Sequence, residues 1–286
     1  MAAPARRASP DVRGETVDRV ENPDLIFDVG AHKGEDSDFY LKLGYRVVAV
    51  EANPALAAEL RERFENAIDM AHYTVVDSAI ADTNGTVSFY VNKTKSLWGT
   101  IDPKWADRNE KVGAASEKIA VTSIRFPDLI TQYGCPNYLK LDIEGADMMC
   151  VKALAATGCR PKYISLESAK TSWRELRAEF KTLEALGYRK FKVVRQGRHK
   201  SGEFTRIDGR KVSYTFGEDA SGPFGNDLTG PWLTRRRAML RYVPIFLSYK
   251  TLGDTTVLAR RFGHVRLVHR ALNFLVGWYD THAMRA

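Results

Sequence analysis

The chain has 286 residues, of which 44% are hydrophobic and 27% are charged, as is ordinary for a soluble globular protein. This length suits one domain of about 200–250 residues with extensions. No apolar run reaches the roughly 18–20 residues needed to cross a bilayer, and residues 1–13 contain no apolar segment of a secretory signal. We therefore expect a cytoplasmic protein whose residues 1–20 form a disordered leader.

The first predicted elements build one half of a nucleotide-type binding unit. In chain order they are a buried strand over residues 25–29, a turn from Gly30 to Gly34, a helix over 36–43 and a second buried strand over 45–50 that ends on Glu51. Such a turn lets the backbone approach a ligand, and an acid at the second strand end can accept hydrogen bonds from ribose hydroxyls. The stretch therefore predicts a site for the nucleoside end of a cofactor.

The turn and the acid before it indicate which cofactor. The pattern is G-x-x-x-G, with His32 where the dinucleotide fingerprint G-x-G-x-x-G has its second glycine. Asp28 would repel a pyrophosphate, but it would suit a ligand that carries an ammonium and a sulfonium. S-adenosylmethionine (SAM) is such a ligand. The sequence favours SAM over NAD(P), and another doubly wound domain with a tight first turn is the remaining alternative.

Strands and helices alternate through the first two-thirds of the chain. This order predicts an α/β fold with a mostly parallel, doubly wound, Rossmann-like sheet covered on both faces. Ligands of such sheets bind at the carboxyl ends of the strands. Five acids fall at predicted strand ends: Asp28, Glu51, Asp77, Asp142 and Glu167. Their common placement predicts a site at that edge.

Residues 92–118 are polar and irregular, but they contain Trp98 and Trp105. An aromatic loop in an α/β enzyme is a candidate lid or substrate-contact segment. A surface loop pinned by tryptophan packing is an equally good interpretation.

The three cysteines, Cys135, Cys150 and Cys159, are odd in number and include no C-x-x-C pair. This pattern predicts reduced thiols, and it favours neither a disulfide framework nor a zinc site.

The sequence resembles the FkbM family of SAM-dependent methyltransferases. The resemblance covers about residues 24–194 and is carried by F-D-V-G-A-H-K-G at 27–34, V-E-A-N-P at 50–54, S-A-I-A-D at 78–82 and Y-L-K-L-D-I-E-G-A-D at 138–147. It implies a class I methyltransferase fold and methylation of hydroxyl groups on sugars, lipids or polyketide-type metabolites. Residues 195–286 lie outside the resemblance, so it does not imply the choice of substrate.

The resemblance also implies cofactor contacts. They fall on nine residues: Asp28, Gly30, Ala31, His32, Gly34, Glu51, Asn53, Asp77 and Ser78. The glycine turn would pass its backbone along the methionyl part of SAM, and Asp28 would hold the ammonium directly or through water. Glu51 would bind the ribose, Asn53 would cap the next helix near the adenosine, and residues 77–78 would contact adenine. For His32, a hydrogen bond within the loop is the alternative.

Methyl transfer to a hydroxyl needs an aligned acceptor oxygen and a base for its proton. Asp142 and Glu144 are the candidate bases, since they follow the predicted strand 138–142. Lys140 lies on the same strand face as Asp142 and could bond a substrate oxygen or one of the acids. The carboxylates could also bind Mg²⁺ or Ca²⁺, but spacing alone does not establish convergence, so a metal is not favoured.

The C-terminal part carries much of the net charge of +8. We expect a SAM-binding domain over residues 21–195 and a C-terminal extension over 196–286 for substrate, interface or membrane contacts. In it, basic residues 235–237 and Arg241 precede an apolar aromatic run, and from Leu258 apolar residues recur at helical spacing. A basic amphipathic helix is typical of an anionic membrane surface. A helix packed on the domain or in a homodimer is the alternative.

Two further expectations concern partners. The acceptor is expected to be a small molecule or a glycan, and no nucleic acid is expected because no recognition motif is present. Two alternative functions stay open, namely a non-catalytic SAM-binding adaptor at a membrane or protein partner and, less favoured, an NAD(P)-dependent oxidoreductase.

Overall fold

The computed structural model describes residues 21–92, 96–111, 114–170, 172–196, 201–252 and 278–285. The predicted leader and the predicted amphipathic segment after Leu258 lie outside these residues.

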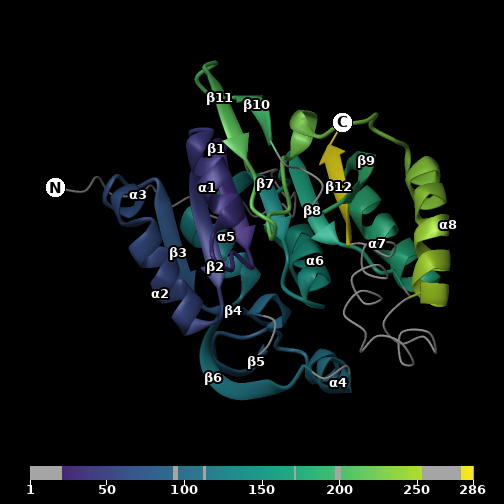
Figure 1. Cartoon of the computed structure of the whole chain (residues 1–286), viewed down its shortest axis with the longest axis horizontal. Coiled ribbons are helices and arrows are strands. Elements are labelled where there is room, and N and C mark those ends of the chain that lie inside the picture. The colour runs from purple at the N-terminus through teal and green to yellow at the C-terminus, as the bar shows by residue number, and fades with distance from the viewer. Residues whose placement is uncertain are drawn as a thin grey trace, which may run out of the picture.

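A seven-stranded sheet forms the centre of the molecule, in the order β3-β2-β1-β7-β8-β12-β9 (Figure 1). Its strands are β1 (Glu21–Val29), β2 (Arg46–Glu51), β3 (Tyr73–Asp77), β7 (Cys135–Leu141), β8 (Tyr163–Glu167), β9 (Tyr188–Arg195) and β12 (Tyr279–Arg285). The pairings from β3 to β8 are parallel, whereas β12 runs antiparallel to both of its neighbours. The predicted mostly parallel α/β sheet is confirmed.

Helices cover both faces of this sheet, as predicted (Figure 1). One face carries α5 (Phe126–Tyr133), α6 (Asp147–Thr157), α7 (Trp173–Ala185) and α8 (Arg235–Leu252). The other carries α1 (Glu35–Lys42), α2 (Pro54–Arg63) and α3 (Glu65–Asp69). The faces follow from strand alternation, because Leu25 and Phe27 of β1 join the first core and Ile26 joins the second.

A hairpin adds to the α1 face. It consists of β10 (Ser201–Thr205) and β11 (Lys211–Thr215), with Asp208 and Gly209 in the turn between them. Phe204 and Phe216 pack their rings against Phe39 of α1, with centroids 4.9 and 4.8 Å apart. A short 3-10 helix, η2 (Gly225–Asp227), ends the loop that follows.

A small sheet lies at one end of the central one (Figure 1). Its strands are β4 (Ala79–Ile80), β5 (Gly85–Asn92) and β6 (Ser116–Ile124), and between β5 and β6 come the 3-10 helix η1 (Ser96–Trp98) and α4 (Pro103–Lys111). The segment that the sequence marks as irregular therefore contains helical elements in its described part.

The last strand places the end of the chain inside the central sheet. β12 pairs with β8 on one side and with β9 on the other, and its residues from Asp280 to Met284 are buried. The insertion satisfies the backbone groups of two strands that would otherwise face each other unpaired. The fold unit thus includes residues that the boundary at 195/196 assigns to an extension.

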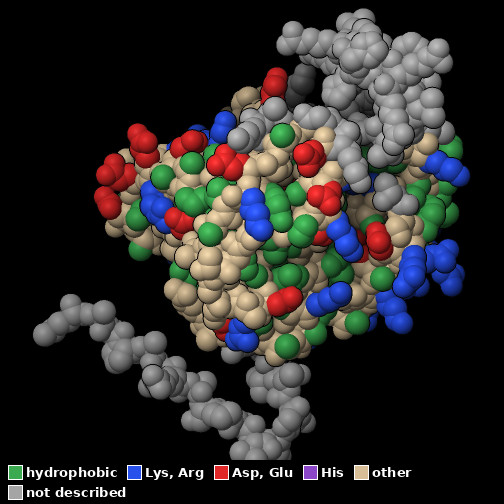
Figure 2. Space-filling model, turned by 90° about the horizontal axis from the view of Figure 1, so that it is seen from below, with side chains coloured by type: hydrophobic (Ala, Val, Ile, Leu, Met, Phe, Trp, Pro, Cys, Tyr) green, Lys and Arg blue, Asp and Glu red, His purple; other side chains and the backbone are tan. Residues whose placement is uncertain are grey.

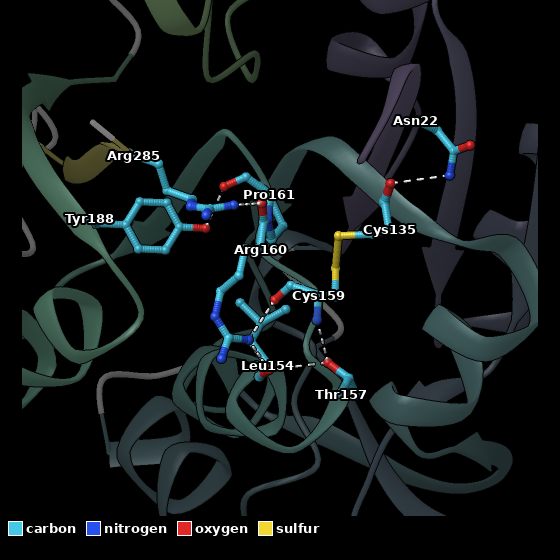
Figure 3. The surroundings of a disulfide bond; sticks show 9 residues. All are labelled: Asn22, Cys135, Leu154, Thr157, Cys159, Arg160, Pro161, Tyr188 and Arg285. Carbon is cyan, nitrogen blue, oxygen red and sulfur yellow. Dashed lines mark hydrogen bonds between the residues drawn. A yellow bond between two sulfur atoms is a disulfide. The ribbon is translucent and has the colours of Figure 1, made fainter. Parts of the chain in front are cut away.

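The prediction of reduced thiols is wrong for two of the three cysteines. Cys135, at the start of β7, and Cys159, after α6, form a disulfide with their Cα atoms 5.4 Å apart (Figure 3). The two cysteines are 24 residues apart in sequence, and their spacing alone does not predict that the fold brings them together. Cys150 is a buried free thiol.

Hydrogen bonds fix the segments around this disulfide (Figure 3). The Asn22 amide donates to the Cys135 carbonyl at 3.2 Å, and Arg160 donates to the Cys159 carbonyl at 2.9 Å. Arg285 of β12 donates to the Arg160 carbonyl at 2.9 Å.

Disulfides are rare in a reducing cytosol, so the disulfide does not support the predicted cytoplasmic location. None of the described helices is long and apolar enough to cross a bilayer.

The disulfide should measurably stabilise the fold. Closing a loop of this length restricts the unfolded chain by about 3 kcal/mol. We expect dithiothreitol, or the pair Cys135→Ala and Cys159→Ala, to lower the melting temperature by several degrees, measured by circular dichroism. Cys150→Ala should leave the response to dithiothreitol intact. Alkylation of three thiols in the denatured, unreduced protein would contradict the disulfide.

Candidate active site

A cavity of about 940 Å³ opens at the carboxyl ends of β1, β2, β7 and β8. Here the strand order changes direction between β1 and β7, which is where ligands bind in open α/β sheets. The turn after β1, the end of β2, the loop after β7 and residues 167–170 line it, and so do Leu97, Trp98 and Trp105 of the predicted lid segment. A volume of this size suits a drug-sized ligand with room beside it.

The glycine turn is required by close packing within the protein. Gly30 has φ +85°, and a Cβ there would lie 2.0 Å from the Asp142 carbonyl oxygen. The Gly30 and Ala31 amides both donate to the Val50 carbonyl, at 2.9 and 3.1 Å. A Cβ on Gly34, at φ +79°, would lie 2.5 Å from the Phe64 ring. Only Gly30 and Ala31 of these three predicted contacts line the cavity.

Glu51 lines the cavity at the end of β2. One carboxylate oxygen accepts the His32 amide at 2.9 Å, and the other accepts the Asn53 amide at 2.8 Å. Burial raises the pKa of Glu51, and the two backbone hydrogen bonds offset part of that rise. Each oxygen keeps a second lone pair, so the group can also accept hydrogen bonds from a diol. Asn53 caps α2 as predicted, because its side chain accepts from the Ala55 amide at 3.1 Å.

Under the turn lies a buried ion cluster centred on Lys140. Asp28 and Lys140 are direct partners in the β1–β7 register, and Lys140 Nζ lies 3.2 Å from Asp28 Oδ1. The second Asp28 oxygen accepts from the Ser37 hydroxyl at 2.7 Å. Asp28 is fully buried and does not line the cavity, whereas Lys140 does. The structure thus gives Asp28 an ion partner inside the protein.

Two more carboxylates complete this cluster. Asp36 of α1 and Asp142 lie 3.4 and 3.6 Å from Lys140 Nζ. Burial lowers the pKa of Lys140, but the three carboxylates outweigh it, so its pKa lies well above the usual value. One buried ammonium therefore faces three acids, and the cluster carries excess negative potential toward the cavity.

Asp36 also connects the cluster to the C-terminal part of the chain. Its oxygens accept the Ser221 amide at 3.0 and 3.1 Å and the Gly222 amide at 3.3 Å. Burial raises the pKa of Asp36 to about 6, against the pull of Lys140. Sequence alone does not indicate this role, because Asp36 resembles an ordinary acid in the first turn of a helix.

The loop after β7 presents Glu144 at the cavity. Glu144 has φ +40°, which is uncommon for a residue with a side chain. Its carbonyl accepts from the Thr100 hydroxyl at 2.9 Å, and a Cβ on Gly145 would lie 2.3 Å from the Trp105 indole nitrogen. Burial, then the charges of Glu167 and Asp142, raise the pKa of Glu144 well above its usual value. The segment that contains Thr100 and Trp105 therefore packs directly on this loop.

A second group of acids lies at the far end of the cavity. Asp147 accepts the Ile143 amide at 2.9 Å and the Glu167 amide at 3.2 Å, and burial raises its pKa to about 7. Glu179 of α7 bonds the Ser168 hydroxyl, and burial raises its pKa to about 8. Lys170 pairs with Glu167. This end is polar, but its charges are only partly paired.

Most predicted site residues meet at this one cavity. Its lining includes nine of them: Gly30, Ala31, His32, Glu51, Asn53, Ser78, Lys140, Asp142 and Glu144. Asp28 and Gly34 lie behind it, and Asp77 pairs with Arg61 at 3.3 Å outside it. His32 has φ +52°, and its Nδ1 lies 3.6 Å from Glu35 Oε2. Sequence reasoning missed Asp36, Glu35 and Glu179, whose positions depend on helix packing.

Among the described residues, no group of three or more His, Cys, Asp or Glu side chains is arranged to hold a metal ion. The ammonium of Lys140 occupies the place between Asp28, Asp36 and Asp142 where a cation would otherwise sit.

The fold and the family match together identify what kind of protein this is. The doubly wound sheet with a nucleoside-type pocket is a Rossmann-like cofactor-binding fold. The sequence matches the methyltransferase FkbM domain over residues 28–190, more than half of the chain. The chain therefore belongs to the FkbM family, and it is a SAM-dependent methyltransferase with a class I fold. A search of curated proteins found no significant match.

Several solved structures resemble the chain at low identity. A precorrin-6Y C5,15-methyltransferase from Geobacter metallireducens is 13% identical, with TM-score 0.38 and coverage of 94% of this chain and 84% of that one. A SAM-dependent methyltransferase from Archaeoglobus fulgidus is 8% identical, with TM-score 0.38 and coverage of 93% and 87%. Phosphoethanolamine N-methyltransferase 2 from Haemonchus contortus, in complex with SAM, is 10% identical, with TM-score 0.37 and coverage of 93% and 49%. Likenesses this weak carry no weight for substrate or mechanism.

The residues present fit SAM. The cavity end beside the glycine turn is lined by Glu35, Asp36 and Glu51, an acidic set that would repel a pyrophosphate and attract a cation. SAM carries a sulfonium and an ammonium but no phosphate. Glu51 would hold the ribose, and Asp36 and Asp142 would face the cationic end.

Removing the buried ammonium should cost stability in a pH-dependent way. We expect Lys140→Met to lower the free energy of unfolding by about 3–5 kcal/mol at pH 7, because it leaves buried carboxylates without a counter-ion. Asp36 already binds a proton more tightly in the folded state, with a pKa of about 6. A carboxylate whose pKa is raised in the folded state makes the folded protein less stable as pH rises. The loss of unfolding free energy in the variant should therefore be smaller at pH 5 than at pH 7.

Urea denaturation at both pH values measures this deficit. Lys152→Met, at an exposed site on α6, is the control and should change stability by less than about 0.5 kcal/mol. An equal deficit at both pH values would show that Lys140 does not compensate the acids.

Glu51 should dominate recognition of the ribose. We expect Glu51→Gln to weaken SAM binding about 10- to 100-fold in calorimetric titration, since hydrogen bonds to a charged group contribute about 1.5–3 kcal/mol. Asp77→Asn, at the end of the neighbouring strand but outside the cavity, should change affinity less than about threefold. Equal effects of the two substitutions would place the ribose elsewhere.

Proposed function

We propose that the protein is an O-methyltransferase that acts on a hydroxyl of a sugar, a glycolipid or a secondary metabolite. The observation that carries the proposal is the acidic and aromatic lining of the far end of the cavity, next to the Glu144 loop. Trp105, Tyr249 and Trp278 contribute rings there, beside the carboxylates. Carboxylates accept hydrogen bonds from hydroxyls, and rings give a polyhydroxylated acceptor an apolar face to pack on.

In this mechanism, Glu144 takes the proton of the acceptor hydroxyl. Its pKa lies above that of an exposed glutamate, so the carboxylate is a stronger base than usual. Asp142, held by Lys140 at 3.6 Å, would accept a second hydrogen bond and orient the acceptor. The packing of Thr100 and Trp105 on residues 144–145 would keep water from the acceptor oxygen.

Lys140 has a different role from that of a base. Its pKa lies well above the usual value, so its ammonium stays protonated near neutral pH and cannot accept a proton. It would position Asp142 and Asp36 instead. Bound SAM supplies the electrophilic methyl group, and alignment of the acceptor oxygen with it is the main demand on the site.

Glu144→Gln tests the assignment of the base. We expect kcat to fall about 10²- to 10⁴-fold with a hydroxyl acceptor while the affinity for SAM changes less than about threefold. The wild-type rate should rise with pH through the pKa of Glu144, and this rise should be lost in the variant. Glu175→Gln, at an exposed site on the rim, is the matched control and should keep its rate.

Acceptors come from a panel of sugars, glycolipids and hydroxylated metabolites, with radiolabelled SAM as methyl donor. Product analysis by mass spectrometry and NMR should place the methyl group on oxygen. A methyl group on nitrogen or carbon would contradict the proposal. SAM binding without turnover on any acceptor would favour the adaptor alternative.

A further inference from the structure

The outward face of α8 is apolar where a surface helix is expected to be polar. Ala238, Tyr242 and Ile245 point into the core and are buried. On the opposite side, Leu240, Val243 and Leu247 are 68, 48 and 61% exposed. Their spacing places them in one stripe along the helix. A contiguous exposed stripe of this kind marks an interaction surface.

Cations flank this stripe without any acid on the helix. Arg236, Arg237, Arg241 and Lys250 are exposed, and the sequence of α8 contains no Asp or Glu. The neighbouring helix α7 adds exposed cations at Arg174, Arg177 and Lys181. Figure 2 shows Lys and Arg side chains gathered around hydrophobic ones at the edge of the molecule where α8 lies.

The two helices are held together firmly enough to present one surface. Trp173 of α7 stacks on Phe246 of α8 with ring centroids 4.2 Å apart. Arg235 of α8 pairs with Glu184 of α7 at 2.7 Å. We define the basic face as the exposed residues 236, 237, 240, 241, 243, 247 and 250 of α8 with 174, 177 and 181 of α7.

We propose that the basic face docks the protein peripherally on an anionic lipid bilayer. Its cations would pair with lipid phosphates, and Leu240, Val243 and Leu247 would insert between headgroups. Nucleic acid would match the charge but would leave the leucines against a polar backbone. A second copy of the chain would match the leucines but would bring like cations together, because a two-fold interface pairs the same surface with itself.

The basic face adjoins the active site. Tyr249 lies on α8 and lines the cavity, and its ring lies 5.7 Å from the Lys170 ammonium, which lines the cavity too. Docking by this face would bring the cavity close to the membrane surface. The surface itself does not depend on the nature of the acceptor, so it stands apart from the proposed O-methylation.

Vesicle sedimentation of the full chain tests the proposal. The vesicles contain phosphatidylcholine alone or with phosphatidylglycerol, in physiological salt. We expect sedimentation with the anionic vesicles only, and weaker binding as salt is raised. Each cation near such a surface contributes about fivefold, so Arg237→Glu with Arg241→Glu should weaken binding about 25-fold or more.

The matched control reverses Lys118 and Lys211, two exposed lysines on β6 and β11, to Glu. It changes the net charge equally and should retain binding within about threefold. Leu240→Ser with Leu247→Ser keeps all charges and should still weaken binding about tenfold, through lost insertion. Equal loss in the control, or no loss in the leucine variant, would overturn the proposal. So would a dimer in light scattering that the leucine variant dissociates.

Discussion

A single buried ammonium ties together the part of the molecule where the cofactor binds. Lys140 draws Asp28 from β1, Asp36 from α1 and Asp142 from the loop after β7 to within 3.2 to 3.6 Å. Burying Lys140, Asp28 and Asp36 beside the partly exposed Asp142 is costly, and their mutual attraction offsets that cost. The cluster links β1, α1 and the loop after β7 at the point where the strand order reverses, and the glycine turn follows directly after Asp28.

This cluster also sets the electrostatics of the pocket. The chain as a whole carries a net charge of +8, yet the walls of the cavity are rich in acids. The negative potential of the pocket favours a cationic cofactor. The positive potential of the basic face favours anionic surfaces. Burial raises the pKa of Asp36, Glu144 and Asp147, and the charges of neighbouring carboxylates raise it further.

Strand-end patterns predicted the fold and most of the site because they are local. Some patterns can be interpreted from the local sequence alone, without knowledge of their spatial neighbours. They are the apolar runs, the glycine turn, Glu51 and the segment 138–147. Asp28 shows the limit of such reasoning, since its place before the turn suggested a ligand contact and its register partner Lys140 turned out to occupy it. Which strand lies beside β1 was not readable from the sequence.

The remaining surprises are also matters of distant contact. Cys135 and Cys159 become neighbours only when α6 packs on the sheet, and odd cysteine counts argued against a bond. The polar strand β12 has no buried-strand pattern in its sequence, and its place in the sheet depends on pairing with β8 and β9. Asp36 acts through loop 221–222, far along the chain. In each case the role of the residue depends on a partner that is distant in the sequence.

A crystal structure of the complex with S-adenosylhomocysteine would test the central claim most directly. The account predicts the ribose hydroxyls at the Glu51 carboxylate, the amino group facing the cluster near Asp36 and Asp142, and Lys140 still paired with a fully buried Asp28. A ligand amine bonded directly to Asp28 with Lys140 displaced, or a ribose away from Glu51, would contradict it.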